Sequence, residues 1–416
     1  MNPKDLSIKD YTYDLPAEKI ARYPVVQRDT SRLLIYNNGQ ITPGIYQQLA
    51  DHLPAGSFLV FNNTKVVEAR LLFQKENGSR IEIFCLEPDE QYPDITTAML
   101  QKKTVLWKCL VGGAKKWKEG LLTAVYKREE QEITLTAEKG ERKGDSYIVQ
   151  LSWNIADMSF AELLHTAGLI PLPPYLERLP EEADKERYQT IYAKYDGSVA
   201  APTAGLHFTD ELFHKLAEKN IQHRFVSLHV GAGTFKPVKT DRMEDHEMHA
   251  EFIDVEKDFI IRLREELNGT IVPVGTTSLR TVESLYWLGV KTIQQPSTDP
   301  SDLFLSQWEP YELSALKISA ADALTGLLKW MDDLGLSRLL TKTQIIIAPG
   351  YAFRIIKGLI TNFHQPQSTL LLLVAALIGD DWKKVYQYAL DNEFRFLSYG
   401  DGSLLWKKNQ ELGIRN

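Results

Sequence analysis

The 416-residue sequence has few cysteines, no long apolar run and little net charge. Its two cysteines, Cys85 and Cys109, are too few for a disulfide framework or a four-sulfur metal site, and their scarcity suits a reducing cytoplasm. The longest apolar run, Leu370–Ile378, is about half the length that spans a bilayer, and it predicts a buried strand or a core helix. The N-terminal stretch has no apolar region of the signal-peptide kind. We therefore expect a soluble, cytoplasmic protein without a membrane partner.

The net charge of −7 provides no general attraction for polyanions. Phosphates are neutralised locally, however, so an acidic protein can still present a basic face to RNA. Residues 69–152 contain 14 lysines and arginines against 13 aspartates and glutamates, whereas the rest of the chain is clearly acidic. Composition alone leaves the partner open.

The pattern of apolar and polar segments changes along the chain, and this change predicts two domains. Residues 69–152 contain short alternating segments separated by polar turns, which is typical of a small all-β barrel or sandwich. From residue 160 onward, strand-like runs alternate with helical periodicity, which predicts an α/β fold with mostly parallel strands. Residues 291–342 interrupt this alternation of strands and helices and are interpreted as an insertion. The α/β domain then consists of residues 1–68 and 153–416.

Three local signals predict individual elements. Asn38-Gly39 between two apolar runs predicts a two-residue β-hairpin. Thr209, followed by two acidic residues, predicts the start of a helix. The segment Gln344–Gly350, QIIIAPG, predicts a strand.

Histidines are concentrated in the middle of the chain, with seven of the nine between residues 165 and 249. In Val199–Leu212, Thr203 and His207 lie where a strand passes into a helix, the place where α/β proteins usually bind ligands. His229 directly precedes the turn Gly231-Ala232-Gly233, which lacks the third glycine of a dinucleotide fingerprint and so argues against a Rossmann site. The alternative for each segment is a tight connection without a ligand.

A third segment contains His246, His249 and Glu251. On a helix the two histidines would share a face and resemble a zinc pair, but the metalloprotease pattern requires a spacing of four with the glutamate between them. Acid–base chemistry is favoured over a metal site, because the ordinary pKa of histidine lies near neutral pH. We predict no metal.

Further polar residues occur at predicted turns. Gly275–Arg280 is a strand-to-helix turn whose Thr276, Thr277 and Arg280 could hold a phosphate or a carboxylate. Polar groups embedded in apolar runs or near glycine turns add four candidates for binding residues, Asn362, His364, Tyr399 and Asp401. Asn63 ends an apolar strand, where a plain turn is an equally good reading.

Taken together, these segments resemble the tRNA ribosyltransferase-isomerases of queuosine synthesis. The motifs that carry the resemblance, in chain order, are FNNTKVVEARL, GSVAAPTAGLHF, SLHVGAGTFKPV, EDHEMHAEF, VGTTSLRTVES, GLITNFHQPQSTL and FRFLSYGDGSLL. The resemblance covers nearly the whole chain. It implies an α/β, barrel-like main domain with a small β-barrel inserted after the first segment.

The resemblance also implies a reaction. The family transfers and rearranges the ribosyl part of S-adenosylmethionine onto an aminomethyl-deazaguanine at the wobble position of certain tRNAs. Epoxyqueuosine forms, adenine and methionine leave, and S-adenosylmethionine is a consumed substrate, so no cofactor is expected. Candidates for the required base and acid are His207, His229, His246, His249 and Glu251, and Arg28 is a candidate contact to the anticodon loop. We expect a monomer.

The chain departs from the usual family pattern at a few positions, among them Lys65, Lys342 and Lys357. An arginine-to-lysine change, as at Lys65, loses bidentate recognition. Two alternatives remain. One is an RNA-binding relative that has lost turnover or changed its acceptor, and the other is a metal-dependent hydrolase that uses the histidine cluster. The first predicts tRNA binding without adenine release, and the second predicts stoichiometric metal.

Overall fold

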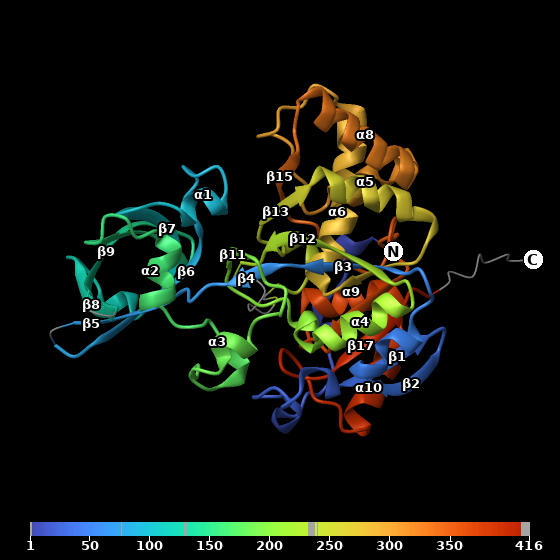
Figure 1. Cartoon of the computed structure of the whole chain (residues 1–416), viewed down its shortest axis with the longest axis horizontal. Helices are drawn as coiled ribbons and strands as arrows, with labels where there is room; N and C mark the ends of the chain where they lie inside the picture. The colour runs from blue at the N-terminus through green and yellow to red at the C-terminus, as the bar shows by residue number, and fades with distance from the viewer. Residues whose placement is uncertain (1, 76, 129–130, 232–237, 239, 409–416) are drawn as a thin grey trace, which may run out of the picture.

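The computed structural model describes residues 2–75, 77–128, 131–231, 238 and 240–408. The chain forms a large body and a smaller β-unit beside it, which lies on the left in Figure 1. Within the described residues, no helix combines the length and the apolarity needed to cross a membrane.

The large body is built on a mixed nine-stranded sheet. Its order is β15 (Arg338–Thr343), β13 (Glu251–Glu256), β12 (Gln222–His229), β3 (Phe58–Asn62), β14 (Ile271–Val274), β16 (Gly358–Asn362), β17 (Gly402–Trp406), β1 (Arg32–Asn37) and β2 (Gln40–Ile45). Strands β12, β3, β14 and β16 are parallel neighbours, as are β17 and β1. The other four pairs are antiparallel.

The α/β class is thus confirmed, but the prediction of mostly parallel strands in a barrel-like sheet is wrong. Half of the neighbouring pairs are antiparallel, and the described strands run from one edge, β15, to another, β2. The predicted hairpin is confirmed, because Asn38 and Gly39 have φ angles of 45° and 88° and reverse the chain between β1 and β2. This reversal makes β1 and β2 one of the antiparallel pairs.

Helices cover both faces of this sheet. Their bounds are α4 (Asp210–Glu218), α5 (Lys257–Glu265), α6 (Thr276–Gln294), α7 (Glu309–Leu313), α8 (Ala320–Asp333), α9 (Thr369–Ile378) and α10 (Asp381–Asp391). The start of α4 is confirmed, because the Thr209 hydroxyl accepts from the Leu212 N–H at 3.2 Å. The apolar run Leu370–Ile378 proves to be a helix, α9, capped by Ser368.

The region 291–342 is continuous with the body rather than separate from it in space. Residue 291 lies inside α6, which is buried along most of its length, and residue 342 lies inside β15, which pairs with β13. Helix α8 between them contributes Leu324, Leu327 and Met331 to the main apolar core. Whether this stretch is an insertion stays a prediction.

The segment Gln344–Gly350 is not a strand, contrary to the prediction. Its isoleucines are buried, but side chains take the place of a neighbouring strand. The Tyr311 hydroxyl donates to the Ile346 carbonyl at 3.1 Å and accepts from the Ala348 N–H at 3.2 Å, and Arg280 donates to the Ile345 carbonyl at 3.2 Å.

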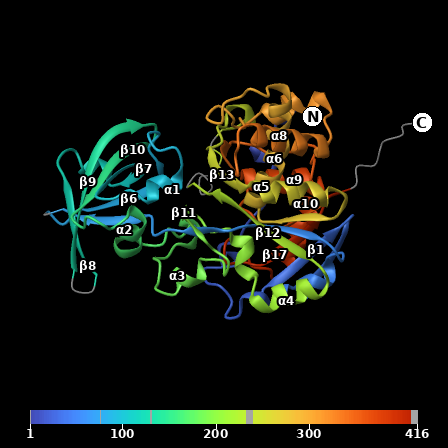
Figure 2. The same ribbon diagram turned by 45° about the horizontal axis from the view of Figure 1, so that its top comes forward.

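The smaller unit is a nearly closed six-stranded antiparallel barrel. Its order is β5 (Arg70–Gln74), β6 (Arg80–Pro88), β7 (Thr104–Gly112), β10 (Ser146–Trp153), β9 (Gln131–Lys143) and β8 (Leu122–Arg128). The Tyr126 hydroxyl donates to the Leu72 carbonyl at 3.2 Å, which joins β8 to β5. Figure 2 shows α1 (Ile95–Met99) on the side of the barrel that faces the body.

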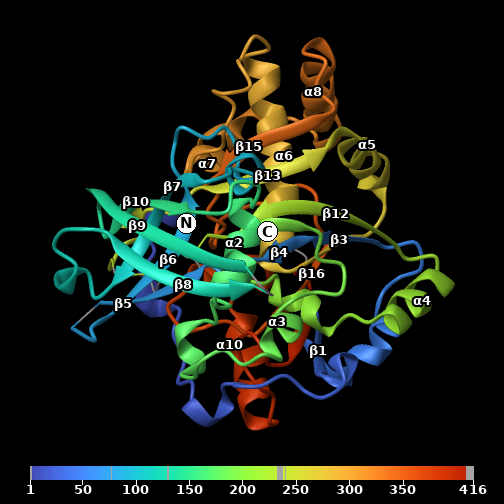
Figure 3. The same cartoon turned by 60° about the vertical axis from the view of Figure 1, so that its left-hand side comes forward.

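The apolar core of the barrel extends beyond residue 152. Helix α2 (Phe160–Ala167) packs on it, with the rings of Phe160 and Trp107 4.8 Å apart. Figure 3 shows the barrel turned toward the viewer. The chain leaves and re-enters the body at one place, where Arg70 and Leu169 exchange two backbone hydrogen bonds of 3.3 and 2.9 Å. The domain boundary at 69–152 stays a prediction.

Candidate active site

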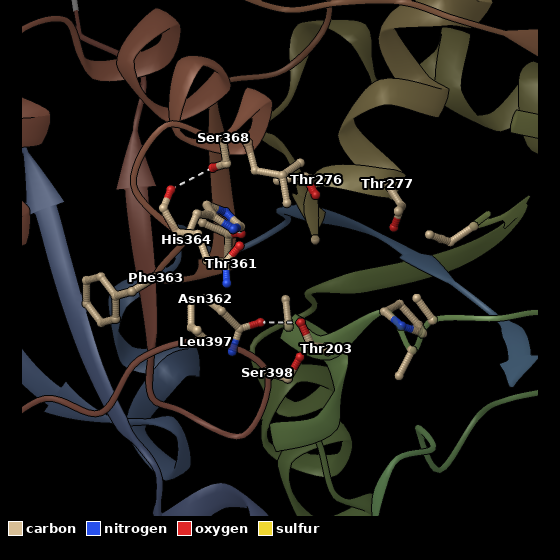
Figure 4. A pocket seen from close by; sticks show the side chains of 18 of the residues that line it. Thr203, Thr276, Thr277, Thr361, Asn362, Phe363, His364, Ser368, Leu397 and Ser398 are labelled. Carbon is tan, nitrogen blue, oxygen red and sulfur yellow. Dashed lines mark hydrogen bonds between the residues drawn. The ribbon is translucent and has the colours of Figure 1, made fainter. Parts of the chain in front are cut away.

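A pocket of about 100 Å³ opens at the carboxyl ends of the parallel strands β12, β3, β14 and β16. In open α/β sheets this edge is where ligands usually bind. The pocket brings together five of the predicted binding residues, which Figure 4 labels: Thr203, Thr276, Thr277, Asn362 and His364. They come from three separate parts of the sequence.

A hydrogen-bonded chain runs along one wall of the pocket. The Thr203 hydroxyl donates to Asn362 Oδ1 at 2.8 Å (Figure 4). Asn362 Nδ2 in turn donates to His207 Nε2 at 3.4 Å. The His207 ring stacks on Tyr46 with centroids 4.2 Å apart. Burial lowers the pKa of His207 to about 3, because a charged imidazole cannot be solvated there. His207 is therefore a neutral ring held in one orientation.

His364 is the imidazole that lines the pocket itself. Its Nε2 lies 3.0 Å from the Thr361 hydroxyl, and its backbone N–H donates to Tyr386 at 3.1 Å. Burial lowers its pKa to about 3 as well, so this ring is also neutral at physiological pH.

The opposite end of the pocket is the start of helix α6. Gly275 has a φ of 89°, which reverses the chain after β14, and no side chain caps the helix. Thr276 is buried, yet its hydroxyl has no hydrogen-bond partner in the part of the chain that the structure describes. The free N–H groups of the first helical turn therefore border the pocket together with this hydroxyl.

His229 ends strand β12, next to the pocket residue Val230. Burial lowers its pKa to about 4, and Nδ1 has no hydrogen-bond partner among the described residues. A Cβ added to Gly197 would lie 3.0 Å from this nitrogen, so the glycine leaves room for the ring. Gly231 follows at the strand end, whereas Gly233 lies outside the described residues.

The third histidine segment does not form a helix at its histidines. His246 is extended and half-buried, and burial lowers its pKa. His249 is exposed and lines a second pocket of about 250 Å³, between the barrel and the body, together with Lys108, Lys143 and Lys342. Of the five predicted catalytic residues, only His249 therefore lines one of these two pockets, whereas His207, His229 and Glu251 are buried and His246 is half-buried.

Glu251 is the interior member of this set. It forms an ion pair with Arg280 of α6, in which 6% and 8% of the two side chains are exposed. Burial raises the pKa of Glu251, and the positive charge of Arg280 opposes that rise. The two candidates therefore contact each other rather than the first pocket.

Four more predicted binding residues have their polar groups engaged by the chain itself. Arg28 donates to three backbone carbonyls, those of Gln189, Leu206 and Glu186, at 2.9 to 3.1 Å. Asn63 accepts from Ser227 at 2.7 Å, Tyr399 donates to Asp184 at 2.7 Å, and Asp401 accepts from the N–H groups of Arg32 and Arg395 at 3.0 and 2.8 Å. Their roles toward a substrate stay predictions.

Sequence reasoning missed two features. His165 lies 2.5 Å from Glu68 and 3.4 Å from Asp196, and the interactions with Asp196 and with Glu68 raise its pKa to about 9. Gln365 lines the first pocket, and its amide has no partner within the described ranges. Gln365 directly follows the predicted His364, and that adjacency was its only signal.

No group of three or more histidine, cysteine, aspartate or glutamate side chains that could hold a metal ion is found in the described part of the chain. The metal-dependent alternative is therefore a question for metal analysis of the protein.

Comparisons with known proteins show what the chain is similar to. The family model described as "Queuosine biosynthesis protein" matches residues 8–405. Two relatives carry the name S-adenosylmethionine:tRNA ribosyltransferase-isomerase. The protein from Magnetococcus marinus is 36% identical over 97% of this chain and 95% of its own length, and that from Legionella pneumophila is 38% identical over 95% and 99%.

A solved structure, an S-adenosylmethionine tRNA ribosyltransferase from Thermotoga maritima, is 28% identical, with a TM-score of 0.44 over 95% of this chain and 99% of that one. The family model matches nearly the whole length of the chain, and the two relatives are 36% and 38% identical to it. The chain therefore belongs to the family of queuosine biosynthesis proteins, the S-adenosylmethionine:tRNA ribosyltransferase-isomerases.

Proposed function

We propose that the protein is a transferase that moves and isomerises the ribosyl moiety of S-adenosylmethionine onto the aminomethyl-deazaguanine at the tRNA wobble position. The products are epoxyqueuosine-tRNA, adenine and methionine. S-adenosylmethionine is consumed as a substrate, and no cofactor takes part. The observation that supports this most strongly is the pocket at the carboxyl ends of the parallel strands, which His364 lines and whose lining residue Asn362 is hydrogen-bonded to the buried His207.

The reaction needs a base, because a proton must leave the carbon beside the sulfonium, whose charge makes that proton acidic. His207 and His229 are candidates for this base because both rings are unprotonated at neutral pH, while burial, which lowers both pKa values, makes them weaker bases than an ordinary imidazole. Nδ1 of His229, which has no partner among the described residues, is the better placed of their nitrogens to accept a proton from a ligand. Glu251 is less suited, because Arg280 occupies its carboxylate.

The tRNA is proposed to approach along the second pocket. The base to be modified lies in a single-stranded loop, from which it can be turned outward at low cost. Lys342 from the body lines that pocket and can contact a phosphate, whereas Lys108 and Lys143 from the barrel pair with Glu87 and Glu90 and would have to exchange these partners for phosphates. In this proposal the barrel at 69–152 is a domain inserted into the catalytic domain, 1–68 and 153–416. The enzyme acts as a monomer in the cytoplasm, where tRNA is found.

The deciding experiment incubates the protein with S-adenosylmethionine and tRNA that carries the precursor base, then measures adenine and modified tRNA. Release of both adenine and epoxyqueuosine-tRNA is expected. Absence of adenine, with an active relative positive in parallel, would refute the proposal. Binding of tRNA without adenine release would identify an RNA-binding relative, and modification of a different base would identify a changed acceptor.

A further inference from the structure

The first pocket is uncharged. Of the described residues that line it, none is a lysine, arginine, aspartate or glutamate, and its histidine, His364, is neutral. A charged ligand group buried there would lose its hydration without gaining a partner, which is costly. The pocket therefore selects an uncharged group.

This selection distinguishes among the groups that the proposed reaction brings together. The sulfonium and the aminomethyl group of the acceptor are cations, the tRNA phosphates are anions, and the methionine end of S-adenosylmethionine carries both an ammonium and a carboxylate. Adenine is an uncharged heterocycle without a charged substituent of its own, whereas the deazaguanine ring of the acceptor carries the cationic aminomethyl group. Resting on the proposed function, we infer that the pocket holds the adenine of S-adenosylmethionine and stabilises it as the leaving group.

The lining of the pocket matches the edge and the faces of adenine. Glutamine and asparagine amides pair with the amino group and a ring nitrogen of adenine, and Gln365 has an amide without a partner in the described chain. Apolar side chains of Val230, Leu370 and Leu397 provide surfaces for the ring faces. The Thr276 hydroxyl, also without a described partner, offers one more donor or acceptor.

The start of α6 provides what a departing base needs. When the bond between adenine and the ribose carbon breaks, its electron pair moves onto the adenine ring, which becomes negative until a proton arrives. Backbone N–H groups at a helix N-terminus and the positive end of its dipole stabilise such charge. The N–H of Thr276, the first residue of α6, is therefore assigned as a positioning donor to a ring nitrogen of adenine.

The test begins with adenine alone as the probe, titrated into the full-length protein by calorimetry. Saturable binding that S-adenosylmethionine displaces and methionine does not displace is expected. No saturable binding up to the solubility limit of adenine would overturn the inference, and so would displacement by methionine.

Two substitutions at one position separate the hydroxyl from the N–H. Thr276→Val removes the hydroxyl only, whereas Thr276→Pro removes both, and proline is well tolerated at the first position of a helix. Gly275 has a ψ of 151°, which suits a residue before proline. We expect adenine affinity to fall about 3-fold to 10-fold in Thr276→Val and further in Thr276→Pro. Equal affinity in the wild type and both variants would overturn the assignment.

Gln365→Leu tests the amide, and Gln387→Leu on the exposed face of α10 is its matched control. We expect a loss of about 3-fold to 10-fold in adenine affinity for Gln365→Leu and none for the control. Because adenine binding is measured without tRNA, the two proposals fail separately. Adenine binding without turnover would refute the proposed function only, and turnover without adenine binding would refute the pocket only.

Discussion

Glu251 of β13 and Arg280 of α6 neutralise each other in the interior of the protein, with less than one tenth of either side chain exposed. Removal of one member of such a pair leaves an uncompensated buried charge, which costs about 3–5 kcal/mol. We predict that Arg280→Met lowers the free energy of unfolding by about this amount, as measured by urea denaturation.

The pH dependence of this loss has a definite sign. Burial already raises the pKa of Glu251, and removal of Arg280 takes away the charge that opposes the rise. A buried carboxyl with a raised pKa stabilises the fold while it is protonated, and that contribution is lost as pH rises. The cost of Arg280→Met should therefore grow from acidic to neutral pH, and the double variant Glu251→Gln/Arg280→Met should be more stable than Arg280→Met. A pH-independent loss would contradict the prediction.

His165 is predicted to stabilise the fold below its raised pKa. The interactions with Asp196 and Glu68 raise that pKa from 6.5 to about 9, so the contribution is complete below pH 6.5 and is lost as pH rises through 9. His165→Gln should lower the urea midpoint most below pH 6.5 and least above pH 9. Equal loss at both ends would show that the ring acts through packing alone.

His207→Ala is predicted to reduce turnover by about 100-fold or more, the usual effect of losing an acid or base group. Because His207 stacks on Tyr46 in the interior, the variant will also lose stability, so rates must be normalised to the folded fraction measured by circular dichroism. Normalised rates equal to those of the wild type would place the catalytic centre elsewhere.

His249→Ala separates catalysis from stability more cleanly, because His249 is exposed in the second pocket. We predict loss of turnover with an unchanged unfolding midpoint. The exposed His214 of α4 offers a matched control, and His214→Ala should retain full activity. If the two variants behave alike, the second pocket has no part in the reaction.

Features that depend on neighbouring residues could be predicted from the sequence. The Asn38-Gly39 hairpin and the start of α4 at Thr209 need only local turn and capping chemistry. The segment Gln344–Gly350 could not be predicted in this way, because the hydroxyl of Tyr311, far away in the sequence, takes the hydrogen bonds that another strand would make. Strand direction in the sheet also depends on chain path rather than on periodicity.

The candidate site shows the same limit. Thr203 was predicted because it lies where a strand passes into a helix, and Asn362 because a polar group embedded in apolar runs must be hydrogen-bonded or functional. Spacing could not show that Glu251 turns inward to Arg280 while His249, two residues before it, faces solvent. Strand β13 begins only at Glu251, so His249 lies before the strand and the alternation of its side chains does not set the direction of His249.

The paired backbone at Arg70 and Leu169 brings together the two ends of the chain segment that forms the barrel. Because these two ends are adjacent, the body needs only a short connection between them, whatever the length of the chain that forms the barrel. A version of the protein in which a tight turn joins these two residues should keep the nine-stranded sheet. The barrel could then be exchanged between relatives as a module, while the body stays the same.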